Sequence, residues 1–124
     1  MKPVIDSLGA FGVVRCAGTL TVQNVDEFRA GVSDWLGAHP ETTTLLLDLA
    51  ELDMLDSSGL GGILALSKRM TERAGNLELA AMTRKVRLVF EITKANSLFV
   101  IHDRVESAVG QDAESATATA ESAE

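Results

Sequence analysis

The run TTTLLLDLA at residues 42–50 constrains the fold of this chain more than any other segment. It is apolar almost without interruption and begins with β-branched threonines, a pattern typical of a short strand covered on both faces. Strands buried in this way occur mainly in sheets whose parallel neighbours are joined by helices. The run therefore predicts an α/β domain.

The segments before this run supply a hairpin and a helix. VIDSL and VVRCAGTL flank the glycine-bearing turn GAFG, so we expect an opening β-hairpin. Residues 24–38 carry apolar side chains at three- and four-residue spacing, which predicts a helix that ends before Pro40. Asn24 is placed to cap this helix, and Glu27 is placed to complete a capping box.

The segments after the run continue the alternation. A helix is predicted from Ser57 to about Gly75, with Leu60, Ile63, Leu64 and Met70 facing inward. NLELAAM then alternates as a strand does, Thr83 can cap a further helix, and a short strand SLFVI precedes a last helix RVESAV. We expect a mixed, mostly parallel β-sheet of four to five strands packed with about four α-helices and right-handed crossovers.

The length of 124 residues corresponds to a single domain, followed by a compositionally different tail. Residues 110–124, GQDAESATATAESAE, contain four acidic residues, no basic ones and no apolar residue larger than alanine. Such a segment buries too little surface to offset its ordering entropy. The predicted domain is 1–109 and the predicted disordered acidic tail is 110–124, acting either as a solubilising extension or as a partner-binding arm.

Charge and composition exclude several classes of function. The net charge of −7, from 11 basic and 18 acidic residues, argues against direct nucleic-acid binding. The single cysteine, Cys16, excludes an intramolecular disulfide and a cysteine-rich zinc site, and it favours a reducing compartment. No secretory signal pattern or 18-residue apolar run is present, so we expect a cytoplasmic protein with no membrane association, no cofactor and no metal.

The junction LDMLDSSGLGGILAL at residues 52–66 is the main candidate for function. In open α/β sheets, ligands and chemistry collect where a strand ends and a helix begins. A helix start offers unpaired N–H groups and about half a positive charge, which stabilise oxygen-bearing or anionic groups. Asp56, Ser57 and Ser58 all suit that position.

Three glycines follow at once in the predicted first turns, at Gly59, Gly61 and Gly62. Each costs about 1 kcal/mol relative to alanine in a helix interior. Because these glycines have no side chains, another backbone can approach the helix closely. That backbone belongs either to the protein's own sheet or to a partner.

Enzymatic interpretations of this junction fit the spacing poorly. GLGGILAL lacks the lysine of a phosphate-binding loop, and the serines lack the preceding glycine of a nucleophile elbow. A hydrolase triad on Ser57 requires His39 or His102 beside it, whereas both look like isolated surface or loop residues. A phosphate on a serine fits better, because the helix start tolerates its charge while a docked partner does not.

Residues 4–109 resemble the STAS family, specifically its bacterial anti-sigma factor antagonists. The similarity lies in VVRCAGTLTVQNVDEF, LLLDLAELDMLDSSGLGGILAL and VRLVFEITKANSLFVIHDRVESAV. An aspartate followed by Ser-Ser-Gly-Leu-Gly resembles the family's phosphorylation motif, which implies Ser57 as the phosphoacceptor and Ser58 as the runner-up. Lys94 stands where the family often has glycine, so we expect an altered turn there. The resemblance assigns partner binding to Asp56, Ser58, Gly59, Leu60, Gly61 and Gly62.

The resemblance implies a partner-switching cycle without catalysis by this chain. The unmodified protein would bind an anti-sigma factor serine kinase and so release a sigma factor. Phosphorylation of Ser57 would break the complex, and a metal-dependent serine phosphatase would restore it. The alternatives are a STAS interaction module of a lipid-transport or stressosome-like assembly, against which the intact DSSGLG argues, and a small hydrolase using Ser57.

Three further residues have specific interpretations. Asp48, placed at the end of its predicted strand, either contacts a partner or accepts local N–H bonds, and the local role is favoured. Cys16 is expected to behave as a small buried hydrophobe and Trp35 as a core residue.

Overall fold

The computed structural model describes residues 2–109, which contain one five-stranded sheet in the order β1-β2-β3-β4-β5. β1 pairs antiparallel with β2, and the other neighbours pair in parallel. The predicted hairpin and the mixed, mostly parallel sheet are therefore confirmed. The strands are β1 (Val4–Leu8), β2 (Phe11–Leu20), β3 (Thr44–Leu55), β4 (Asn76–Ala80) and β5 (Val100–His102).

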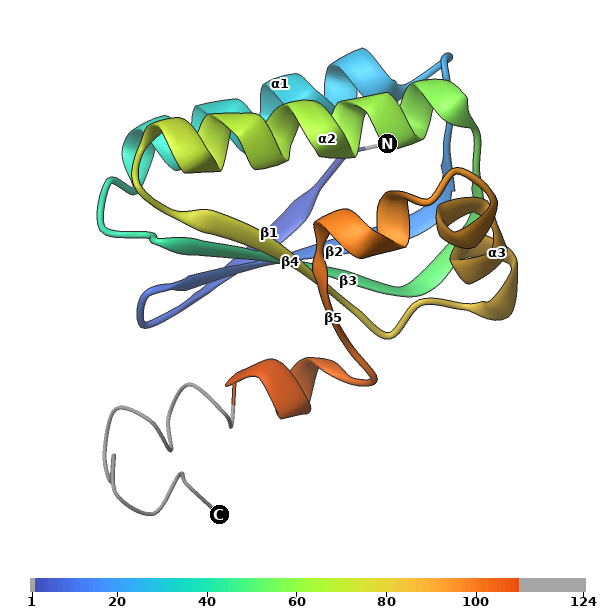
Figure 1. Ribbon diagram of the computed structural model, residues 1–124. Coiled ribbons are helices and arrows are strands. Elements are labelled where there is room, and N and C mark those ends of the chain that lie inside the picture. Colours follow the sequence, from blue (N-terminus) through green and yellow to red (C-terminus); the bar gives the residue numbers. More distant parts are fainter. Residues whose placement is uncertain (1, 110–124) are drawn as a thin grey trace.

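Helices cover the sheet unequally on its two faces. Figure 1 shows α1 and α2 lying side by side over one face, α3 beside the carboxyl end of β3, and the helical residues 105–109 on the opposite face. The bounds are α1 (Val25–Ala38), α2 (Ser57–Glu72), α3 (Arg84–Ile92) and the short 3-10 helix η1 (Ala95–Leu98).

β3 is buried on both faces, as its apolar run predicts. Leu45, Leu47 and Leu49 belong to the main core between the sheet and the helices. Leu46 belongs to a smaller cluster on the other face, together with Phe11, Val13, Ala80 and Ala108. The last helical residues thus cover part of the face that α1 and α2 leave open.

Several element boundaries differ from the predictions. β3 continues to Leu55, so the placement of Asp48 at a strand end is wrong. β4 pairs with β3 only as far as Asp48, whereas β2 pairs with it as far as Leu55 and so extends the strand. The Asp48 Oδ1 accepts a hydrogen bond from the Ala50 N–H at 3.1 Å, which is the local role. The helix predicted to reach about residue 75 ends at 72, and the last strand is 100–102 because residues 95–98 form η1.

The two predicted helix caps have different outcomes. Asn24 precedes α1 but makes no capping bond, so the predicted capping box is wrong. Its side-chain oxygen instead accepts from the Thr21 N–H and its amide donates to the Thr19 carbonyl, which holds the β2–α1 loop. Thr83 caps α3 as predicted, because its hydroxyl oxygen accepts a hydrogen bond from the Val86 N–H.

Lys94 adopts a left-handed conformation with φ of 62°. This is the conformation that glycine favours, so the backbone of the turn after α3 is one that suits glycine, and the altered turn stays a prediction. Cys16 and Trp35 behave as predicted. Burial raises the pKa of the Cys16 thiol to about 12, and Trp35 packs partly buried against the core.

Candidate functional site at the amino end of α2

Asp56 organises the start of α2 through hydrogen bonds to the backbone. Its Oδ1 accepts from the Gly59 N–H at 2.8 Å and its Oδ2 accepts from the Val22 N–H at 3.1 Å. Its own N–H donates to the Leu20 carbonyl, and its carbonyl accepts from the Leu60 N–H. The helix start is therefore tied to the end of β2 and to the loop that follows.

The hydrogen bonds also fix the charge of this carboxylate. The Gly59 N–H contributes most to lowering the pKa of Asp56, the Val22 N–H adds to that effect, and partial desolvation opposes it. Asp56 is thus negatively charged at neutral pH and already satisfies the nearest amide of the first turn.

Two of the three motif glycines are required by packing and one is not. A Cβ at Gly59 would collide with the Leu20 carbonyl oxygen, and a Cβ at Gly62 would collide with Val25 of α1. A Cβ at Gly61 would meet nothing within 4 Å. Gly59 and Gly62 therefore serve close approach within the domain, and Gly61 leaves a bare site on the surface.

The two serines and the neighbouring residues of α2 divide between surface and interior. Ser57 is exposed and Ser58 is half-buried, whereas Leu60 is buried along with the two packing glycines. Leu64 was predicted to face inward but is 36% exposed, and Leu66 occupies the buried position instead. Ser57, Gly61 and Leu64 follow helical spacing and share the outward face of α2.

Two exposed apolar residues near Asp56 were not identified by the sequence analysis. Val22 is 66% exposed and is held beside Asp56 by the hydrogen bond from its N–H. Met54 is 53% exposed and lies two residues before Asp56 in β3. Only the tertiary arrangement brings Val22 here, so no local pattern could have found it. The Ser57 surface is defined below as Val22, Met54, Ser57, Gly61 and Leu64.

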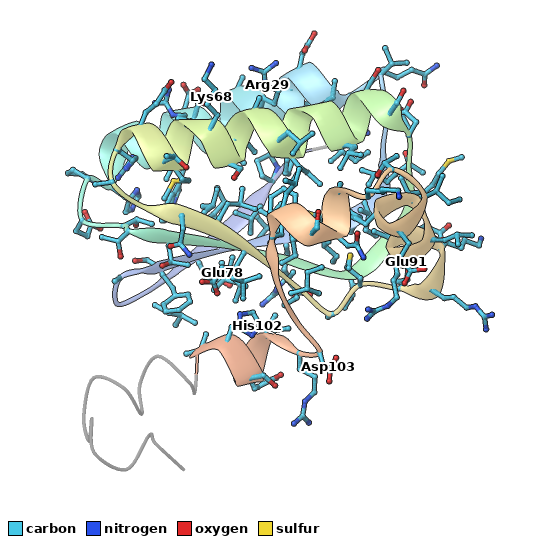
Figure 2. All side chains as sticks on the ribbon, in the orientation of Figure 1. Arg29, Lys68, Glu78, Glu91, His102 and Asp103 are labelled. Carbon is cyan, nitrogen blue, oxygen red and sulfur yellow. The ribbon has the colours of Figure 1, made fainter. Side chains whose placement is uncertain are left out.

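The two histidines are half-buried and have partners of their own. His39 lies in the loop after α1, as predicted, whereas His102 lies in β5, which corrects the prediction of a surface or loop residue there. The His39 ring stacks on Trp35 at 3.8 Å, and its Nδ1 lies 2.8 Å from the Trp35 carbonyl oxygen. The His102 Nε2 lies 2.8 Å from the Glu78 Oε1 across β4 and β5 (Figure 2). Neither ring is therefore paired with Ser57 as a hydrolase triad requires.

Among residues 2–109, no group of three or more His, Cys, Asp or Glu side chains is arranged to hold a metal ion. The helices within that same range are all too short or too polar to cross a bilayer.

Comparison with known proteins identifies the family. The model of the STAS domain matches residues 2–108, so the chain belongs to the STAS domain family. BtrV of Bordetella bronchiseptica, a protein proposed to be an anti-sigma factor antagonist, is 27% identical over 108 residues, covering 87% of this chain and 91% of BtrV.

Solved structures agree with the fold. TM1081 of Thermotoga maritima, proposed to be an anti-sigma factor antagonist, has a TM-score of 0.80 at 21% identity, covering 88% of this chain and 92% of TM1081. The anti-sigma factor antagonist SpoIIAA has TM-scores of 0.68 unphosphorylated and 0.69 phosphorylated, at 22% and 23% identity. The comparison with unphosphorylated SpoIIAA covers 90% of this chain, and the comparison with the phosphorylated form, which is from Bacillus, covers 88%. Both cover 97% of SpoIIAA. The fold is thus that of the STAS domain.

Proposed function

We propose that this protein is an anti-sigma factor antagonist controlled by phosphorylation of Ser57. With a free hydroxyl it binds an anti-sigma factor and causes release of a sigma factor, and with a phosphate it dissociates. The observation that carries the proposal is an exposed serine at a helix start, together with the exposed apolar side chain of Val22, which is held beside Asp56. The names of BtrV and SpoIIAA, and the existence of SpoIIAA in a phosphorylated form, support it.

The Ser57 surface suits protein binding in its unmodified state. Val22, Met54 and Leu64 expose apolar side chains whose burial is worth about 25 cal/mol per Å². Gly61 has open space where a side chain would project, so a partner backbone can approach α2 closely. An apolar centre with polar neighbours is the usual composition of such an interface.

A phosphate on Ser57 changes the charge of this surface without disturbing the core. It adds about −1.5 to −2 charges next to the Asp56 carboxylate. Because Asp56 already accepts the Gly59 N–H, the new charge is not neutralised by that amide and faces the partner. Burying it against an apolar interface carries a large desolvation penalty, so the complex dissociates.

The protein is a substrate and binder in this cycle and has no catalytic role. The anti-sigma factor is a serine kinase that uses ATP, and a serine phosphatase removes the phosphate. The cycle takes place in the cytoplasm, without direct contact between this chain and nucleic acid or membrane.

Incubation with candidate anti-sigma kinases and ATP, followed by mass spectrometry, tests the proposal. We expect one phosphate on Ser57, none on the Ser57→Ala variant, and normal phosphorylation of Ser58→Ala. Ser57→Ala should remain bound to the kinase and Ser57→Asp should bind weakly, with exposed Ser107→Ala as the matched control. Equal binding by wild type, Ser57→Ala and Ser57→Asp would eliminate the switch, and a phosphate on Ser58 would move the site.

A further inference from the structure

A basic groove runs along the seam between α1 and α2, beyond the point where the helices touch. The helices meet closely at Gly62 and Val25, near their amino ends. Further along the seam lie two adjoining cavities of about 400 and 440 Å³, which share Arg69 and Glu72. Arg29 and Lys68 stand above the helix layer on the side away from the sheet (Figure 2). The basic groove is defined by Arg29, Ser33, Lys68, Arg69, Glu72 and Arg73.

The charge of this groove is opposite to that of the protein. Four of the 11 basic residues line it, against the single carboxylate of Glu72, whereas the chain has a net charge of −7. The Arg73 guanidinium donates to the Leu36, His39 and Thr42 carbonyls, which leaves its positive charge unpaired by a carboxylate. Within residues 2–109, no ion pair involves a basic residue of the groove. Such a cluster concentrates a positive potential that attracts anionic groups.

We propose that the acidic segment 110–124 of the same chain docks in the basic groove. This segment lies outside the described residues and contains no basic residue. Its four carboxylates, at Asp112, Glu114, Glu121 and Glu124, complement the cations of the groove.

The place where the described chain ends favours this occupant. Ala108 belongs to the same buried cluster as Phe11, which pairs in register with Thr44 at the start of β3. The loop before β3 contributes the Thr42 carbonyl, which accepts a hydrogen bond from Arg73 at one end of the groove. The described chain therefore leaves the domain at the end of the sheet where this end of the groove lies. The groove is lined by residues of α1 and α2, and Figure 1 shows that these helices pack on the other face of the sheet.

The length of the segment is sufficient to pass from one face to the other. Fifteen extended residues span at most about 50 Å, compared with a domain diameter of about 30 Å. Glu121 and Glu124 can therefore reach the whole groove. Asp112 and Glu114, three and five residues beyond Val109, reach at most about 18 Å and contact only its nearer rim.

Docking of this kind is weak in each contact but is favoured by the tether. Linking the segment to the domain gives an effective concentration in the mM range. Exposed ion pairs are screened by salt, so the docked state must disappear at high ionic strength. Ser57 begins α2, whereas Lys68, Arg69 and Glu72 of the groove lie 11 to 15 residues further along the same helix, about 16–23 Å away, so docking against these residues does not cover Ser57. This inference is independent of the proposed function.

A spin label on Ser122→Cys tests the proposal directly. Cys16 does not compete for the label because it is buried. In about 20 mM salt we expect at least a twofold loss of the amide NMR signals of Ser33, Gly37 and Arg69, with recovery at about 0.5 M salt. A label on Ser107→Cys, on the opposite face, should leave these signals intact. Unchanged groove signals in the Ser122→Cys protein would overturn the proposal.

Charge substitutions separate docking from a general effect of net charge. In the labelled Ser122→Cys protein, Glu121→Gln with Glu124→Gln should restore most of the intensity of the groove amide signals. Asp112→Asn with Glu114→Gln should restore less of it. These substitutions lie outside the domain, so they keep the test valid if a groove variant fails to fold.

Reversal of the groove charges provides the complementary test. Arg29→Glu with Arg69→Glu should restore the signals, whereas Arg84→Glu with Lys85→Glu on α3, with the same change of net charge, should not. Equal effects of the two reversals would refute docking in the groove. Broadening only on the open face of the sheet, or groove shifts that arise only on addition of a second protein, would likewise refute it.

Discussion

The two ends of α2 are anchored in similar ways and expose opposite chemistry. At the amino end, the Asp56 carboxylate accepts backbone N–H groups, which leaves Ser57 and Gly61 facing outward. At the carboxyl end, the Arg73 guanidinium donates to the Leu36 carbonyl in the last turn of α1 and to two carbonyls of the α1–β3 loop, which leaves Arg69 lining a groove. Each charge also complements the helix dipole at its end. Under the two proposals above, one helix presents two separate surfaces, one sensitive to added negative charge and one that attracts it.

Substitution of the motif glycines should give the largest difference within the amino end. Gly59→Ala places a Cβ against the Leu20 carbonyl oxygen, which belongs to the backbone of β2 and cannot move aside cheaply. We expect a loss of about 3 kcal/mol in the free energy of unfolding. Gly61→Ala, the matched control, should raise it by about 0.5–1 kcal/mol because the site is open. Urea denaturation measures both, and effects of equal sign would show that the two glycines are not distinct.

The carboxyl end is tested by removing its anchor. Arg73→Met keeps much of the apolar stem but removes the donors to three carbonyls, so we expect a loss of about 2 kcal/mol in the free energy of unfolding. Arg69→Met removes a neighbouring charge that lines the groove and should change the same quantity by less than about 0.5 kcal/mol. Similar losses in the two variants would mean that Arg73 is not the anchor.

The charge of the amino-end anchor predicts a dependence on pH. Hydrogen bonding lowers the pKa of Asp56 in the folded state, so its contribution to stability is present above the unfolded pKa of about 3.9 and is lost as pH falls through the folded value. Asp56→Asn retains a capping oxygen but removes this titration. Thermal unfolding between neutral pH and pH 2 should therefore show a shallower acid loss in Asp56→Asn. Superimposable acid dependence in the two proteins would contradict the assigned role.

The smallest expected effect lies away from both ends of α2. Lys94→Gly relieves a left-handed backbone at a position outside the core, with part of the gain offset by the greater freedom of glycine in the unfolded chain. We expect the free energy of unfolding to rise by about 0.5 kcal/mol, measured by urea denaturation. Binding at Ser57 and the groove signals should stay unchanged, and a change in either would show that the two surfaces are not confined to α2.

The parts of the fold with local signals were predicted well from the sequence. The apolar run of β3, the glycine turn of the hairpin and the Thr83 cap each depend on nearby residues, and each is confirmed. The full length of β3 was not predicted, because its second half is held by pairing with β2 rather than by its own pattern.

The candidate site was predicted only in outline. The spacing of DSSGLGG places Asp56 and Ser57 at the helix start, but it does not separate Gly59, which packs on the backbone of β2, from Gly61, which faces open space. Val22 and the basic groove depend on how the β2–α1 loop and α1 lie against α2. No local periodicity carries that information.

In the proposed function, a charge on Ser57 changes a binding surface and leaves the fold intact. The most direct measurement is calorimetric titration of the cognate anti-sigma kinase with the unmodified and the Ser57-phosphorylated protein, with urea denaturation of both forms in parallel. We expect binding to weaken by about 100-fold or more on phosphorylation, while the free energy of unfolding changes by less than about 1 kcal/mol. Equal affinities, or a loss of binding that accompanies an equal loss of stability, would contradict it.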